Sequence, residues 1–192
     1  MLAVRPVGAA DHAGCAPPAV IVAVLVTLAA ALGGGCAAAS NPGPDPGAAS
    51  GPNAVVVRVI DGDTVVVAVG GREESARLIG IDTPETKRPD TPVECFGPQA
   101  SDRLSALLPP DTPVRLELDQ EPRDRYGRLL VYLHRTGDGA LVNQVMLREG
   151  LADALSIAPN TAFTEPFAAE VTAARAGGVG LWGACPGPHA AP

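Results

Sequence analysis

Hydrophobic and polar residues follow two different periods along residues 54–182, and the change of period separates strands from helices. Short valine- and leucine-rich runs predict five strands, at residues 54–60, 64–69, 74–81, 114–118 and 129–133. Apolar residues at helical spacing predict three helices, near residues 98–108, 141–149 and 166–176. This order of elements predicts an α+β, mainly β domain, namely a five-stranded Greek-key barrel of the OB type with three helices.

Turn residues mark where these elements begin and end. Asp61-Gly62-Asp63 separates the first two runs and is typical of a hairpin turn. Pro98 stands where helices start, and Pro109-Pro110 stands where the same helix must stop. Residues 86–94 are polar and contain two prolines, which predicts a mobile loop between the third strand and the first helix.

The apolar run at residues 19–32 predicts a signal peptide covering residues 1–36. It is too short to span a bilayer comfortably and has about the length of a signal-peptide core. The alternative is a buried core helix, which the absence of amphipathic spacing disfavours. Cys36 follows small residues and resembles the cleavage cysteine of bacterial lipoproteins, so the sequence leaves both a lipid anchor and plain cleavage open.

Residues 37–53 are rich in Pro, Gly, Ala and Ser and cannot bury enough apolar surface to fold. We therefore expect a flexible linker there, a folded domain at residues 54–185, and a flexible tail at residues 186–192.

Export would place the domain in an oxidising compartment, where cysteines form disulfides. Once the leader is set aside, Cys95 and Cys185 remain. We predict a disulfide between them that joins the C-terminal end to the body of the domain. The alternative is two free thiols, which exported chains rarely keep.

The chain carries 14 basic and 21 acidic residues, a net charge of −7. An acidic surface repels nucleic acid at long range, which argues against a protein that coats DNA non-specifically. A locally positive cleft is still allowed, because contacts at short range are screened less than the field of the whole molecule.

Candidate chemistry is concentrated in two runs that each end in carboxylates. Residues 59–64 read Val-Ile-Asp-Gly-Asp-Thr, and residues 77–85 read Arg-Leu-Ile-Gly-Ile-Asp-Thr-Pro-Glu. Carboxylate oxygens are the ligands that a hard divalent cation prefers. A cation and an arginine held together stabilise a phosphodiester under attack by water. Taken singly, each run is more typical of a turn, and residues 124–128 of a charged hairpin loop.

Together, the motifs resemble the staphylococcal-nuclease-like thermonucleases over most of residues 54–182. The resemblance rests on several motifs in order: Val-Ile-Asp-Gly-Asp-Thr at 59–64, the run from Arg77 to Lys87, Phe-Gly-Pro-Gln-Ala-Ser at 96–101, the run from Asp124 to Leu130, Val142-Asn143, and Gly-Leu-Ala at 150–152. It implies an OB barrel that binds Ca²⁺ and cleaves DNA and RNA to 3′-phosphate products.

The resemblance also implies roles for individual residues. The residues similar to the family's calcium ligands are Asp63 and Asp82, through their carboxylates, and Thr83, through its backbone carbonyl. Those similar to its catalytic residues are Arg77, Glu85 and Arg128, with Glu85 either the general base or only the group that orients water. Those expected to contact substrate are Lys87, Arg125 and Tyr126, although Tyr126 is equally typical of loop packing. Asp61 matches an acid beside the metal ligands, and Lys87 and Arg88 would steer the substrate.

The sequence departs from the family's archetype at two places. Leu155 and Ile157 stand where the archetype has tyrosines that line the nucleotide pocket, which predicts weaker base stacking by about 1–3 kcal/mol per aromatic. The chain is also acidic where the archetype is basic. Both departures concern substrate affinity and leave the catalytic residues in place.

We therefore expect an exported monomer that hydrolyses DNA and RNA with Ca²⁺, single strands being favoured. It would be extracellular, either secreted or held on the membrane through a lipid at Cys36. The alternatives are a non-catalytic OB module that binds nucleic acid and a calcium-stabilised adhesion module, and the presence of all three catalytic residues favours the enzyme. His12 lies in the leader, His134 on a strand where we expect it to face solvent, and His189 in the tail. We expect none of them to act as a metal ligand or base, which argues against zinc enzymes and histidine-dependent nucleases.

Overall fold

The computed structural model describes residues 51–87 and 92–190. The predicted leader, Cys36, most of the linker and Arg88 lie outside these residues. The domain boundaries proposed from the sequence stay predictions. In the two described ranges, no helix has both the length and the hydropathy needed to cross a bilayer.

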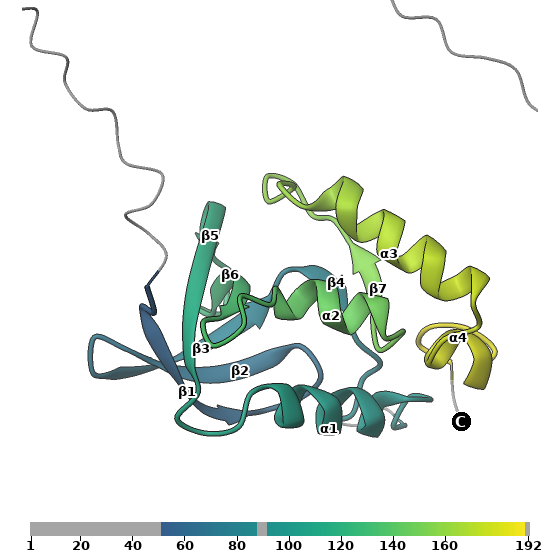
Figure 1. The fold of residues 1–192 in the computed structure, drawn as a ribbon, viewed down its shortest axis with the longest axis horizontal. Coiled ribbons are helices and arrows are strands. Elements are labelled where there is room, and N and C mark those ends of the chain that lie inside the picture. Colours follow the sequence, from purple (N-terminus) through teal and green to yellow (C-terminus); the bar gives the residue numbers. More distant parts are fainter. Residues whose placement is uncertain (1–50, 88–91, 191–192) are drawn as a thin grey trace, which may run out of the picture. The chain divides into compact units, whose positions relative to one another are not determined.

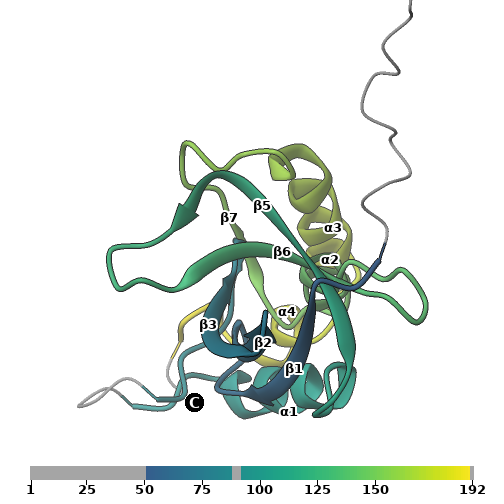
Figure 2. The same ribbon diagram turned by 90° about the vertical axis from the view of Figure 1, so that its left-hand side faces the viewer.

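Five strands close into a barrel, as the hydrophobic pattern predicted (Figures 1 and 2). They are β1 (Ala54–Val59), β2 (Thr64–Val69), β3 (Arg72–Leu78), β5 (Pro113–Arg123) and β6 (Leu129–Arg135). Neighbours pair in the order β1-β2-β3-β6-β5, and β5 returns to pair with β1. The β3–β6 pair is parallel, and it brings the end of β3 beside the start of β6. Residues from these two strands therefore meet at one side of the barrel.

The predicted third strand is in fact two strands, because the chain turns at Gly80. Gly80 has a φ of +79°, and a Cβ there would lie 2.6 Å from the ring of Phe167, so no other residue fits. After the turn, β4 (Gly80–Asp82) leaves the barrel and pairs with β7 (Asp153–Leu155), a strand that the sequence did not predict. Because of this turn, Asp82 follows Arg77 by five residues in the sequence and still contacts its side chain.

The helices cover the barrel and the small β4–β7 sheet. They are α1 (Gly97–Leu107), α2 (Val142–Arg148), α3 (Thr164–Ala176) and the single-turn α4 (Leu181–Ala184), of which α4 was not predicted. α2 packs against β6, β4 and α3, and α1 packs against β1 (Figure 1). Valine and leucine side chains from the barrel and these helices form one continuous buried core. This core holds the strand ends that carry the polar residues described below.

The predicted pairing of Cys95 with Cys185 is present in the structure. The two residues are 90 positions apart in sequence, and their Cα atoms lie 6.0 Å apart. The bond fixes the segment after α4 to the segment that precedes α1.

Candidate active site

The two carboxylate-ending runs meet at one cavity of about 420 Å³. The turn between β1 and β2 supplies Asp61 and Asp63, and the end of β4 supplies Asp82 and Thr83. Gly62 allows this meeting, because a Cβ there would lie 2.6 Å from the Thr83 hydroxyl and 3.0 Å from a side-chain carbon of α1. The close approach of two turns therefore requires glycine at the centre of the first one.

Asp63 is the most fully buried carboxylate of the cavity, with 8% of the residue exposed. Its Oδ2 accepts hydrogen bonds from the amide of Thr83, at 3.2 Å, and from the hydroxyl of the same residue, at 2.9 Å. Its Oδ1 accepts a bond from the Thr64 hydroxyl at 3.0 Å. A buried charge is tolerated only when it is paired and hydrogen-bonded, and Asp63 meets both conditions.

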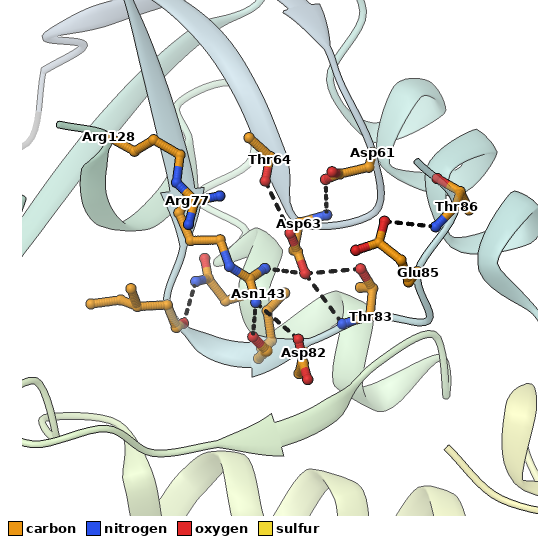
Figure 3. A network of polar contacts seen from close by, with 12 residues as sticks. Asp61, Asp63, Thr64, Arg77, Asp82, Thr83, Glu85, Thr86, Arg128 and Asn143 are labelled. Carbon is orange, nitrogen blue, oxygen red and sulfur yellow. Dashed lines mark hydrogen bonds and ion pairs between the residues drawn. The ribbon is translucent and has the colours of Figure 1, made fainter. Parts of the chain in front are cut away.

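The guanidinium of Arg77 lies between the two aspartates (Figure 3). One of its nitrogens forms an ion pair with Asp63, and another lies 3.0 Å from Asp82 Oδ1. The second nitrogen also donates to the carbonyl of Ile81 at 3.1 Å. Burial lowers the pKa of Arg77 below its usual value, although Asp82 acts against this change. Two carboxylates that we predicted as metal ligands thus face a single positive charge.

Asp61 and Glu85 lie on the same cavity. Burial raises the pKa of the Asp61 carboxyl, and a hydrogen bond from Thr64 opposes that rise. Glu85 Oε1 accepts bonds from the amides of Thr86 and Lys87, both at 2.9 Å. The carboxylate of Glu85 is thereby oriented by the backbone that follows it, and its own amide donates to Glu94 at 2.8 Å.

Arg128 lies at the start of β6 and lines the cavity beside Arg77 (Figure 3). Its Nε donates to Asp124 Oδ2 at 2.7 Å, and its amide donates to the other oxygen of the same carboxylate at 2.9 Å. These bonds hold the guanidinium in one orientation while its remaining N–H groups stay available for a planar anion.

A second cavity, of about 430 Å³, lies next to the first and shares Arg77 and Arg128 with it. Its walls include Tyr126, Leu155 and Ile157, which are 70%, 37% and 64% exposed. The Tyr126 ring lies under two guanidiniums, 4.8 Å from Arg125 and 5.7 Å from Arg128. Arg77 and Arg128, which line both cavities, therefore stand between them. We call the first the polar cavity and the second the apolar cavity.

The predicted site residues are not all in one place. Those on the first cavity are Asp63, Arg77, Asp82, Thr83, Glu85 and Arg128. Arg125 and Tyr126 line the second cavity, and Lys87 is exposed at the end of the described loop and lines neither. Their roles as ligands, catalysts or substrate contacts stay predictions.

Asn143 is a buried residue whose role the sequence did not reveal, although it belongs to one of the motifs of the resemblance. Its side chain accepts a bond from the Leu133 amide at 2.9 Å and donates to the carbonyl of Ile79 at 2.8 Å. It thereby ties α2 and β6 to the turn that separates Arg77 from Asp82. An isolated asparagine at the start of an apolar helix face gives no sequence signal for such a role.

We expected no histidine to act as a metal ligand or base, and this stays a prediction, but one histidine lies at the site. His189 lines the first cavity, with its Nε2 at 3.2 Å from Asp82 Oδ2 and its Nδ1 at 2.7 Å from Glu94 Oε2. His134 was also expected to face solvent, but its side chain is only 17% exposed and bonds to Glu117 at 2.8 Å. The sequence carried no signal for either contact, since both depend on strands and a tail that meet only in the fold.

The donor set at the first cavity fits a hard divalent cation. Asp63 and Asp82 supply carboxylate oxygens that already converge on one guanidinium, and Thr83, the residue directly after Asp82, would supply a backbone carbonyl. Among the described residues, no cluster of three or more His, Cys, Asp or Glu side chains is arranged for a metal ion. A cation here would therefore depend on the carbonyl, on water and on substrate for its remaining ligands.

Comparison with known proteins identifies the family. Residues 75–184 match the family model described as staphylococcal nuclease homologue. The chain belongs to the staphylococcal nuclease family. This confirms the resemblance, and the closed barrel of five strands confirms the predicted fold.

The similar proteins of this family include two thermonucleases and an endonuclease. The chain is 44% identical to a thermonuclease of Staphylococcus hyicus and 46% identical to one of Staphylococcus intermedius, each over 57% of this chain. It is 36% identical to endonuclease YncB of Bacillus subtilis over 68% of this chain. The matched regions span 63%, 64% and 61% of these relatives' own lengths.

The match to the family model begins inside β3, so it contains Arg77, Asp82, Glu85 and Arg128 but not Asp61 or Asp63. The structure adds the last two, because β2 pairs with β3 in a register that sets Thr64 opposite Arg77. In this chain, the strand register therefore places the turn between β1 and β2 at the site.

Proposed function

We propose that this chain is an exported, Ca²⁺-dependent nuclease that hydrolyses phosphodiester bonds of DNA and RNA and leaves 3′-phosphate ends. One observation carries the proposal: two arginines stand at the boundary between a carboxylate-lined cavity and an apolar cavity of similar size. A nucleotide has the same division, with a charged phosphate on one side of the sugar and, on the other, a base whose faces stack on apolar surfaces. The names of the similar thermonucleases and of endonuclease YncB support the nuclease part of this proposal.

In this proposal, the arginines bind the phosphate. Each guanidinium can direct two N–H groups onto phosphate oxygens, and this planar pair of donors suits the charge that gathers on the equatorial oxygens in the transition state. Removing one donor of this kind typically raises the barrier by about 3–4 kcal/mol. The guanidinium of Arg128 is oriented by its hydrogen bond to Asp124, whereas that of Arg77 is paired with Asp63 and Asp82.

Glu85 would act on the attacking water, either as the base that accepts its proton or as the group that orients it. Its Oε1 is fixed by two backbone amides, which sets the direction of the carboxylate. Water adds to phosphorus and gives a proton to Glu85 or to solvent, the bond from phosphorus to the 5′ oxygen breaks, and the leaving 5′ oxygen takes up a proton from solvent. Glu85 either accepts the water's proton or only orients the water, and the rate of a Glu85→Gln variant would distinguish these roles.

Asp63, Asp82 and the carbonyl of Thr83 would hold Ca²⁺. When bound, the ion supplies positive charge that neutralises and positions the phosphate. Asp61 would lie beside these ligands, where its Oδ1 accepts a hydrogen bond from the amide of Asp63 at 3.2 Å. Titration calorimetry with Ca²⁺ on wild type and on an Asp82→Asn variant would test the assignment, since equal affinity would remove Asp82 from it.

Export is proposed from the leader and is compatible with the disulfide, which belongs in an oxidising compartment. We propose a monomer that is secreted or held at the membrane through Cys36. Mass spectrometry of the protein recovered from the producing cells and medium would show whether residues 1–36 have been removed and whether Cys36 carries lipid.

The activity itself is tested by incubating the chain with single-stranded DNA, double-stranded DNA and RNA in Ca²⁺, and again with a chelator. We expect cleavage of all three that stops with chelator, fastest on single strands, with 3′-phosphate ends. Binding without cleavage would instead support a non-catalytic nucleic-acid-binding module. Calcium binding without either would support the adhesion module.

A further inference from the structure

The C-terminal tail returns to the polar cavity. Cys95 binds the tail at two positions, one before and one after His189. Cys95 is bonded to Cys185 through the disulfide, and the amide of Cys95 donates to the carbonyl of Ala190 at 2.8 Å. The segment between these two anchors contains His189. Its position at the cavity is therefore fixed from both ends.

His189 completes a chain of polar contacts at the cavity, which consists of one contact with Asp82 and two hydrogen bonds to Glu94. Its Nε2 lies 3.2 Å from Asp82, and its Nδ1 lies 2.7 Å from Glu94 Oε2. The same oxygen of Glu94 accepts the amide of Glu85 at 2.8 Å. The imidazole thus links the carboxylate at the end of β4 to the backbone of the residue proposed as general base.

The backbone of His189 is in a conformation that most residues avoid. Its φ is +56°, in the left-handed region, where histidine and asparagine occur more often than other non-glycine residues. Such conformations persist where surrounding contacts determine them, and they gather at functional sites. Here the surrounding contacts are the two bonds of the tail to Cys95 and the contacts of the imidazole with Asp82 and Glu94.

We propose that His189 is a positioning residue for the nuclease reaction, held at the site by the Cys95–Cys185 disulfide. It orients Asp82 directly and the Glu85 backbone through Glu94. The inference rests on the proposed function, which assigns Asp82 to the metal and Glu85 to the attacking water. Groups that orient metal ligands in this way typically change metal affinity or activity by 10- to 100-fold when they are removed.

The first test is a His189→Asn variant of the full-length chain. Asparagine accepts the left-handed backbone, but its shorter side chain cannot bridge Asp82 and Glu94. We expect calorimetry to show about 10-fold weaker Ca²⁺ binding, and kcat on a single-stranded DNA oligonucleotide to fall about 10- to 100-fold. KM should change much less, because the arginines and the apolar cavity are untouched.

The matched control is His134→Asn. His134 is the other histidine in the described part of the chain, and it also bonds to a carboxylate, Glu117, at 2.8 Å, but it does not line the cavity. Its loss should leave Ca²⁺ affinity and kcat at wild-type values. A fall in both variants alike would mean that histidine loss acts through general stability, and it would overturn the proposal.

Two further measurements separate positioning from attachment of the tail. In His189→Gly, which suits a φ of +56°, free imidazole should restore part of the lost kcat, whereas it should not affect wild type. In a Cys95→Ser/Cys185→Ser double variant, kcat should fall as in His189→Asn. Because that variant also loses a cross-link, its melting temperature should fall more than that of His189→Asn. Unchanged kcat in the double variant at a temperature where it is folded would overturn the role of the disulfide.

The outcomes distinguish this inference from the proposed function. If wild type cuts DNA with Ca²⁺ and His189→Asn matches it within twofold in kcat and Ca²⁺ affinity, the inference fails alone. If His189→Asn cuts faster than wild type, the tail inhibits the site and the inference also fails. If wild type neither binds Ca²⁺ nor cuts any nucleic acid, the proposed function fails and the inference fails with it.

Discussion

The two neighbouring cavities have nearly the same volume and share two arginines, but they are built in opposite ways. In the polar cavity, every acid that we predicted as functional bonds to a named partner, and Asp63 alone accepts three hydrogen bonds. In the apolar cavity, Tyr126 and Ile157 are mostly exposed, and the side chains of Leu155 and Ile157 offer no polar group. The polar cavity should therefore tolerate almost no substitution, and the apolar one should tolerate many.

The largest effect is expected from Arg128→Lys, which changes the boundary between the cavities. Lysine keeps the charge but loses the planar pair of donors and the bond from Nε to Asp124. We expect kcat to fall by about 10²- to 10³-fold with little change in melting temperature. Steady-state kinetics on single-stranded DNA, with thermal unfolding in parallel, would measure both. Arg58→Lys is the control and should keep the wild-type rate, since Arg58 is exposed, pairs with Glu73 and lines neither cavity. A wild-type rate for Arg128→Lys would remove Arg128 from the mechanism.

Asn143→Ala tests how strictly the polar side depends on its supports. The change leaves the buried amide of Leu133 and the carbonyl of Ile79 without their partner, so the free energy of unfolding should fall by about 2–3 kcal/mol. Urea denaturation would measure the loss. Asn53→Ala removes a similar pair of backbone hydrogen bonds, to Leu116, from an exposed residue. Water can replace that pair, so the control should lose less than half as much, and equal losses would contradict the argument.

The difference between the cavities also explains what could be predicted from the sequence. The barrel followed from short valine- and leucine-rich runs between turn residues, and the residues of the polar cavity were predicted from the ordered motifs of the family resemblance. The split between β3 and β4 was missed, since the continuous apolar run through residue 81 hides the turn that Gly80 and Phe167 require.

The contacts of His189 and Asn143 could not be predicted for a different reason. Each joins segments that are far apart in the chain, with 95 positions between His189 and Glu94 and 64 between Asn143 and Ile79. No local pattern encodes such pairs. The predicted disulfide pointed to the return of the tail, but not to what the tail carries beyond Cys185.

Tyr132 is a buried residue of β6 whose ring packs against Phe163 and Phe167, and it gives a prediction about pH. Burial and its hydrogen bond to Asp119 raise the pKa of Tyr132 to about 12. In the unfolded chain it titrates near 10, so ionisation favours unfolding between these values. Stability should be fully present below pH 10 and fall by up to about 3 kcal/mol toward pH 12. Urea midpoints at several pH values would show this slope, and Tyr132→Phe should lack it. A slope that persists in Tyr132→Phe would place its origin elsewhere.

The smallest effect is expected from adding an aromatic ring to the apolar wall, with Leu155→Tyr. Leu155 is 37% exposed at the edge of β7, so a larger ring can extend over the cavity without entering the core. Stacking on a base should strengthen binding by about 1 kcal/mol, because the leucine it replaces already supplies part of the contact. KM for single-stranded DNA should fall roughly fivefold while kcat stays constant, since Arg77 and Arg128 are unchanged. A change in kcat instead would show that the apolar wall takes part in the chemistry, and that the two cavities are not separable in the way their construction indicates.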